Sequence, residues 1–512
     1  MDLWGVWSVD GGGHTIIYNF IVPTVAALSG VVAYAIGTLL LKRHHWLPLI
    51  ILILPNAAFF WYFCSGLNVA EIGFYSSHLI SGSWNPYPLF TFIGGGPHAH
   101  LLNSFNQLLF IFFLTFMFVK WSKLTNSGKS ILIGVMALSL GSMPGIHTHD
   151  VLIYALAYIA IAGIIWHYKE QHDITKIYYF ISIPILSLAI YSPLLYYMLT
   201  GVGSSIHGIS LVTSPTTITE YLGIYLLFII IIVIYTLNTL KTHPWILLVP
   251  IVFAFFNYGA VGISLFCIFL LLKNRNMHFE TIVAIIGFCV LIAMDIIYLN
   301  DFTGTRCNTV YKFVYIAWFL LGISSSVMAG RLLENHLSWL TKKRIWACII
   351  VILVCLFIVP VQIGGNINHS NESLDGSDWI KHANRGDYEG IHYLRENANP
   401  KDIIVEAVSL GGYEGRISVM TGLSTVLGWA GNGHEGGWRI GTDYGDEVPS
   451  RIDDVKKIYE NSSVTVKLMD KYGAKYLIVG DSELKMYNVS LPSEGIENVF
   501  SYENMTIIQR IK

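Results

Sequence analysis

Charged residues are scarce in this sequence. Only 12% of its 512 residues are Asp, Glu, Lys or Arg, whereas about a quarter are charged in a soluble globular protein. The mean hydropathy is correspondingly high, at +0.56. This balance excludes an ordinary soluble domain and indicates a membrane protein.

Cysteine is also rare, with six residues in the chain and none after residue 363. No CxxC pair occurs, so we expect neither a disulfide framework nor a cysteine metal site. The first apolar run, near Thr15, follows a lead without basic residues and ends without a small-residue cleavage signal. We therefore expect it to be a retained membrane helix and not a cleaved signal peptide.

Long apolar runs are abundant, and each is about the length that crosses a bilayer. Counting them predicts about twelve membrane helices. The runs begin near Thr15, Trp46, Leu101, Ile131, Val151, Ile177, Tyr221, Trp245, Ala260, Thr281, Tyr311 and Ile345.

The charges divide the chain into two parts. Residues 1–363 hold 16 basic and 11 acidic residues, and 14 of the basic ones fall in alternate loops, which the positive-inside rule assigns to the cytoplasm. The N-terminus and the acidic tail then lie outside, as do all five Asn-x-Ser/Thr sequons. We predict a multi-spanning domain over 1–363, a linker over 364–386 and a small extracytoplasmic α/β domain over 387–512.

Histidines gather in the outer loops, as His98 and His100 in PHAH and as His149 beside Asp150 in HTHD. Imidazole and carboxylate together suit a divalent metal such as zinc, manganese or magnesium. The alternative is that these side chains lie at the membrane interface and cap helix starts, where an acid is favourable.

Arg306 and Lys312 are the only basic residues before 364 that this topology leaves outside. With Asn308 between them, they could bind an anion such as a phosphate. The alternative for Arg306 is an ion pair with Asp295 or Asp301.

A glycine-rich stretch from Arg416 to Arg439 combines aromatic and charged residues. Glycine lets the backbone approach a ligand closely, so the stretch is typical of a binding loop. The alternative is a surface loop whose tryptophans fill a small core. The candidate binding residues are Trp429, His434, Glu435, Trp438 and Arg439.

Three segments carry a resemblance to a known family: YPLFTFIGGGPHAH at 87–100, RCNTVYKFVYIAW at 306–318 and GRISVMTGLSTVLGW at 415–429. They resemble the YYY-type polytopic membrane proteins of archaea and green non-sulfur bacteria, which are placed near the C-type (GT-C) integral membrane glycosyltransferases. The resemblance implies a GT-C-like bundle of about twelve helices. Where relatives read G-D-L-H-x-H, this chain has Gly96 in place of the acid.

The resemblance implies a membrane glycosyltransferase that uses a polyprenyl-phosphate-linked sugar donor at the outer membrane face. A glycan, a lipid or a protein would be the acceptor, the chain would contact the lipid bilayer, and no nucleic acid is expected. Arg306, Asn308 and Lys312 would hold the phosphate, and the 429–439 loop would cover the acceptor. The candidate catalytic residues are Asp150, Glu71, His98 and His100, and the candidate metal ligands are His98, His100, His149 and Asp150.

Two other functions fit the same sequence. A lipid or glycan transporter or flippase is compatible with the helix count, although transporters place ionisable groups near the midplane and show repeats. A non-catalytic surface-assembly protein is favoured if Gly96 marks a lost active site.

Overall fold

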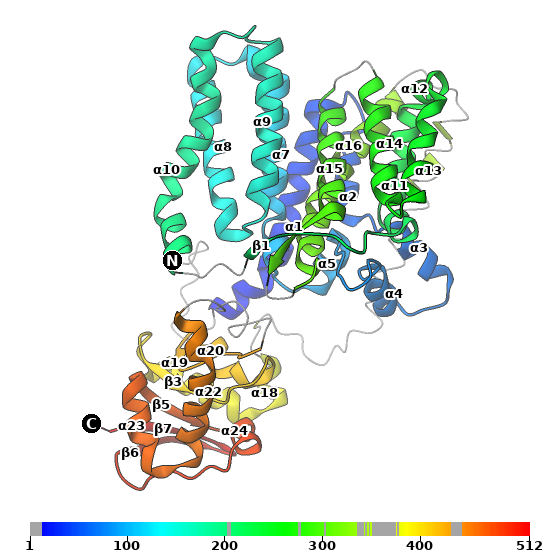
Figure 1. The fold of residues 1–512 in the computed structure, drawn as a ribbon. Coiled ribbons are helices and arrows are strands. Elements are labelled where there is room, and N and C mark those ends of the chain that lie inside the picture. Colours follow the sequence, from blue (N-terminus) through cyan, green and yellow to red (C-terminus); the bar gives the residue numbers. More distant parts are fainter. Residues whose placement is uncertain are drawn as a thin grey trace. The chain divides into compact units, whose positions relative to one another are not determined.

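The computed structural model describes residues 13–201, 206–274, 278–301, 304–334, 378–431 and 443–511, with residue 375 and some residues of 342–350 (Figure 1). The chain divides into two compact units. The larger comprises residues 21–196 and 208–367, and the smaller comprises 368–512 together with 1–20 and 197–207.

Most of the larger unit is helical, and within the described residues eight helices are long and apolar enough to cross a bilayer. A bent pair, Leu47–Ile53 with Ala57–Cys64, would make a ninth span. The expected multi-pass membrane protein is therefore confirmed. The eight spans are Ile17–Leu40 (in α1, Gly13–Leu40), Ala99–Lys123 (α6, Ala99–Leu102, α7, Ser104–Lys120, and η2, Trp121–Lys123), Asn126–Ile146 (α8), Asp150–Tyr168 (α9), Ile174–Leu199 (η3, Ile174–Lys176, and most of α10, Ile177–Gly201), Ile218–Tyr235 (α11), Phe279–Ile296 (α15) and Cys307–Glu334 (α16).

The expected count of twelve is not reached among these residues. The runs from Trp245 and Ala260 form helices that are too short to span alone, α13 (Leu248–Phe255) and α14 (Gly259–Lys273). Most of the run from Ile345 lies outside the described residues. The figure of twelve and the orientation of the termini stay predictions.

Helix α16 lies at the centre of the bundle and packs against α15, α11 and α7. Its side chains from Val310 to Met328 are almost all buried, and Trp318 donates a hydrogen bond from Nε1 to the carbonyl oxygen of Ile51 at 3.1 Å. A helix that is apolar all round must be buried on every side. The first turns of α16 (Cys307–Glu334) are therefore firmly placed; they carry Asn308 and Lys312, and Arg306 directly precedes them.

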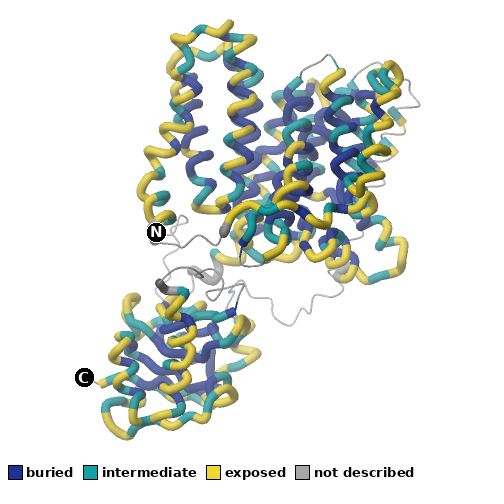
Figure 2. The backbone as a smooth tube through the Cα atoms, viewed as in Figure 1, coloured by how far each residue is buried: buried dark blue, intermediate teal, exposed yellow. Residues whose placement is uncertain are grey.

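Many positions along α9 and α10 are exposed, as Figure 2 shows, and many of the exposed residues are apolar. Leu152, Leu156 and Ile159 of α9 are all more than half exposed. They recur at helical spacing on one face, and in a bilayer such a face contacts lipid. This pattern supports contact between the chain and the membrane.

Short elements close one end of the larger unit. They include α3 (Ala57–Cys64), α4 (Val69–Ser76), α5 (Pro88–Gly94) and the two-stranded sheet of β1 (Ile206–Leu211) and β2 (Ile297–Asp301). Asn85 shapes the connection from α4 to α5, because its buried side chain accepts from the backbone nitrogens of Leu79 and Ile80 and donates to the carbonyl oxygen of Ser76. It thereby fixes the neighbouring Ser81 and Gly82.

The tail contains a five-stranded sheet in the order β4-β3-β5-β7-β6. Strand β3 (Ile403–Val405) pairs parallel with β4 (Ser424–Thr425) and β5 (Ala474–Val479), whereas β7 (Met505–Arg510) pairs antiparallel with β5 and β6 (Ile496–Tyr502).

Successive residues of these strands enter two separate cores because side chains alternate between the faces of a sheet. Val405 and Leu477 pack with α22 (Asp443–Glu460) and α23 (Ser462–Tyr472), whereas Ile404 and Ile478 pack with α18 (Asp378–Ala383), α19 (Arg385–Asn397) and α20 (Arg416–Thr421). The tail is thus a sheet with helices on both faces.

Part of the predicted linker is folded. Residues 378–383 form α18, whose Ile380 is fully buried, and α19 begins at Arg385. The short amphipathic pattern of α18 carries too few residues to signal a helix by periodicity alone.

Candidate functional site

Asp150 begins α9, and its carboxylate is completely buried. Oδ2 accepts hydrogen bonds from Asn103 Nδ2 at 2.5 Å and from Gln107 Nε2 at 2.6 Å, while Oδ1 lies 2.6 Å from His147 Nδ1. The two amides come from the start of α7, so Asp150 joins α7 to α9. Because both oxygens are engaged, this geometry favours a positioning role over the predicted role as base or metal ligand.

His147 precedes α9 and is buried beside Asp150. Its Nδ1 faces the carboxylate, and its Nε2 makes no hydrogen bond with any residue that the structure describes. An imidazole that donates Nδ1–H to a carboxylate keeps a lone pair on Nε2 when neutral. The sequence signal for this pair is the H-x-x-D spacing across a helix start, within the segment HTHD.

His100 and His98 lie at the start of α6. The His100 ring is buried and meets the rings of Tyr311 and Tyr315 edge-on, at 4.8 and 4.9 Å between centroids. Its Nε2 has no hydrogen-bond partner among the residues that the structure describes. His98 is exposed and its ring is nearly parallel to that of His100, at 5.7 Å.

His149 lies between α8 and α9, with its ring 5.8 Å from that of His147. Burial, and then the nearby Lys312 and His147, lower the pKa of His149 to about 3. It is therefore neutral near pH 7. Together with His98, His100 and His147, it forms what we call the histidine cluster.

A metal at these residues finds no support in the geometry. Across the described parts of the chain, no three or more His, Cys, Asp or Glu side chains are grouped so that they could hold a metal ion. The predicted ligand Asp150 is occupied by two amides and an imidazole.

Lys312 lies in the second turn of α16, next to the histidine cluster, and is mostly buried. Its ammonium makes no hydrogen bond or ion pair with the described residues, and it interacts at longer range with Asp301 and His149. Asn308, in contrast, donates from Nδ2 to Asp301 Oδ2 at 2.6 Å. Of these two predicted phosphate ligands, Lys312 is the one that remains available.

Arg306 forms an ion pair with Asp295, at 2.8 Å between Nη1 and Oδ1. Asp295 is 1% exposed and also accepts from Thr216, at 2.5 Å from Oγ1 and 3.1 Å from the backbone nitrogen. The ion pair expected as the alternative for Arg306 is thus present, and Asp295 is its partner. Sequence alone left Asp295 and Asp301 equivalent.

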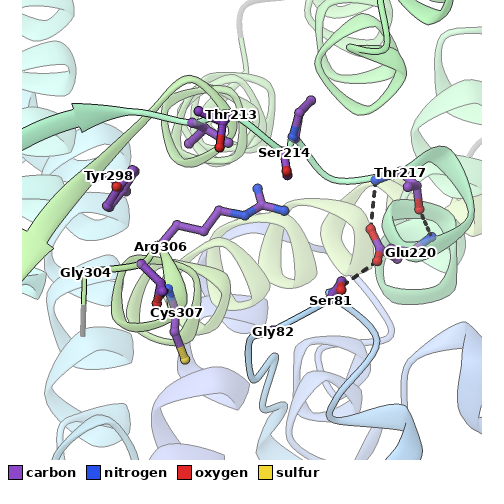
Figure 3. A pocket seen from close by; sticks show the side chains of 13 residues that line it. Ser81, Gly82, Thr213, Ser214, Thr217, Glu220, Tyr298, Gly304, Arg306 and Cys307 are labelled. Carbon is purple, nitrogen blue, oxygen red and sulfur yellow. Dashed lines mark hydrogen bonds between the residues drawn. The ribbon is translucent and has the colours of Figure 1, made fainter.

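A pocket of about 470 Å³ opens beside Arg306 (Figure 3). Three parts of the chain line it: residues 81–82, residues 212–215 with 217 and 220, and residue 298 with 304–307. Both Gly82 and Gly304 turn there with positive φ. Glycine adopts that conformation without strain. Most of the polar groups on the wall are hydroxyls, from Ser81, Thr213, Ser214, Thr217, Tyr298 and Thr305.

Two other candidates have structural partners. Glu71 caps α4, since its carboxylate accepts from the Asn68 backbone nitrogen at 3.1 Å. A Cβ on Gly415 would come within 2.8 Å of Trp429 Nε1, so this tryptophan packs on the backbone of the tail. The rest of the predicted binding loop, His434, Glu435, Trp438 and Arg439, lies outside the described residues.

The start of the predicted loop is core and not binding surface. Arg416 is 3% exposed and is paired with Asp387, at 2.7 Å from Nε, and with Glu483, at 3.0 Å from Nη2. Glu406 lies close by, and burial raises its pKa to about 7.

Comparison with known proteins places the membrane part of the chain in a family. Residues 8–321, more than half of the chain, match the model of an uncharacterized membrane protein family, DUF2298. No curated protein matches the sequence. The match covers the histidine cluster and the Arg306 pocket, and it assigns neither of them a reaction. The chain belongs to the DUF2298 family of uncharacterized membrane proteins.

Proposed function

We propose that this protein is a membrane glycosyltransferase that moves a sugar from a polyprenyl-phosphate donor to a hydroxyl group of a glycan, lipid or protein acceptor. The observation that carries the proposal is the buried Asp150–His147 pair, whose free Nε2 lies in the histidine cluster beside the available Lys312. A membrane-spanning bundle is the setting that a lipid-linked donor requires.

The pair has the geometry of a positioned general base. Asp150 holds the Nδ1–H of His147, which leaves Nε2 to accept a proton from the acceptor hydroxyl. Asn103 and Gln107 hold Asp150 in turn. His147 would be the catalytic residue, and Asp150 would be the residue that positions it.

Lys312 supplies the charge for the other half of the transfer. As the acceptor oxygen bonds to the anomeric carbon, the bond from that carbon to the phosphate oxygen breaks, and the polyprenyl phosphate leaves with the electron pair. A cation next to the departing oxygen stabilises that charge in a site that excludes water. Lys312 can do so because no carboxylate within ion-pair distance neutralises it among the described residues.

The test is sugar transfer by the purified full-length protein, with a radiolabelled polyprenyl-phosphate sugar and a mixture of acceptor lipids and glycans. We expect His147→Ala to lower kcat about a hundredfold or more while donor KM stays within a factor of two or so. The matched control is His243→Ala, which removes a histidine between α12 (Leu237–Thr242) and α13. No transfer by the wild-type protein with any donor, or equal rates for the two variants, would contradict the proposal.

A further inference from the structure

The Arg306 pocket has a rigid wall built from segments far apart in the chain. Glu220 accepts from the backbone nitrogen of Thr217 at 2.8 Å and from that of Ser81 at 3.0 Å, and Figure 3 shows these bonds at one side of the pocket. Ser83 donates from Oγ to the carbonyl oxygen of Cys307 at 3.0 Å. The backbone that carries Ser81, Thr217 and Cys307 is therefore held in place before any ligand arrives, which lowers the cost of binding.

The one carboxylate on the wall does not oppose an anion. Both oxygens of Glu220 face backbone N–H groups, each of which carries partial positive charge. Because Thr217 caps α11 in the same reciprocal arrangement, the carboxylate also lies at the positive end of a helix dipole. The two N–H groups and the start of the helix thus stabilise the negative charge of Glu220.

Arg306 uses only one of its three nitrogens for its ion pair. Nη1 meets Asp295, and Nε and Nη2 make no hydrogen bond with the described residues. The guanidinium extends along the pocket towards Thr213 and Ser214 (Figure 3). Asp295 therefore holds the Arg306 guanidinium through Nη1 and leaves the N–H groups of Nε and Nη2 for a second acceptor.

We propose that this pocket binds the phosphate ester of a polyol, with the phosphate on Arg306 and the polyol hydroxyls on the serine and threonine side chains around it. A planar guanidinium edge matches two phosphate oxygens. The pocket volume of about 470 Å³ falls in the range of small-molecule sites, roughly 300 to 1,000 Å³.

The ligand could be a lipid head group or a soluble phosphate ester, and both have this chemistry. If sugar transfer takes place at the histidine cluster, the Arg306 pocket would be a second binding site, built from other residues than the cluster. The inference concerns binding alone, so it does not require that the glycosyltransferase proposal be correct.

Binding can be measured by calorimetry on the full-length protein in detergent, with sn-glycerol 3-phosphate, dihexanoyl phosphatidylglycerol, inorganic phosphate and glycerol as probes. We expect either or both of the phosphate esters to bind, at least about tenfold more tightly than inorganic phosphate or glycerol. Tighter binding of the lipid identifies a head group, and tighter binding of glycerol phosphate identifies a soluble ligand. Inorganic phosphate binding as tightly as the esters would overturn the polyol part.

Ser214→Tyr keeps the Arg306 ion pair and fills the pocket, so it should weaken ester binding about tenfold or more without lowering the melting temperature. Ser214 is exposed and has no hydrogen-bond partner within the described residues, which makes it a safe position. Ser127→Tyr, at an exposed serine of α8, is the matched control. Unchanged affinity in Ser214→Tyr, or no ester binding by the wild-type protein, would refute the proposal.

Discussion

The Arg306–Asp295 pair should respond asymmetrically to mutation. Asp295 is 1% exposed, whereas Arg306 is 13% exposed and lies on an open pocket. Arg306→Gln leaves a buried carboxylate with only the two bonds from Thr216. Asp295→Asn leaves a cation that water or a ligand can reach.

Removing one partner of a buried ion pair costs about 3–5 kcal/mol. Because Asp295 keeps two hydrogen bonds from Thr216, Arg306→Gln should cost about 3 kcal/mol, at the lower end of this range. Asp295→Asn should cost about 1 kcal/mol, the value of one net hydrogen bond, because Arg306 is resolvated through the pocket. The double variant should fall near the Arg306→Gln value or below it, since the unpaired charge is gone.

The assay is unfolding of the purified full-length protein by sodium dodecyl sulfate in mixed micelles, followed by circular dichroism. Both single variants, the double variant and the wild type complete a double-mutant cycle, with an expected coupling of about 1–3 kcal/mol. Equal losses for the two single variants, or a coupling near zero, would refute the asymmetric burial of the pair.

Three further predictions concern the tail and the topology. Arg416→Met should lower the free energy of unfolding by about 3–5 kcal/mol in a denaturant titration, because two buried carboxylates lose their cation. Burial raises the pKa of Glu406 from 4.5 to about 7. Glu406 therefore loses its proton at a lower pH in the unfolded chain than in the folded protein, and the stability of the wild type should fall as pH rises from 4.5 to 7. Glu406→Gln should remove this pH-dependent loss, so the variant should gain up to about 3 kcal/mol over the wild type at pH 8 and nothing below pH 4.5. A difference in stability between the two proteins that does not change with pH would contradict this. A cysteine at Ser463 should react with an impermeant reagent on intact cells while one at Ser127 should not, and the reverse would overturn the predicted orientation.

Much of the architecture could be predicted from the sequence because it depends on local patterns. Apolar runs of about twenty residues form the helices whose length and composition suit a bilayer. In the tail, the predicted mixture of helices and strands appears as a five-stranded sheet with helices on both faces. Short elements such as strand β6 and helix α20 are hard to predict, because six or seven residues of mixed polarity carry little periodic signal.

The sequence by itself determined that this chain is a multi-pass membrane protein whose unusual polar residues gather near helix starts. Which of those residues face one another was decided only by tertiary structure. Asp295 is 11 residues from Arg306 and pairs with it, whereas Asp150 is held by amides more than 40 residues away. Such partners are chosen by how the helices pack, and spacing along the chain does not encode packing. The same cause made Arg416 a core residue and left Lys312 available for an anion.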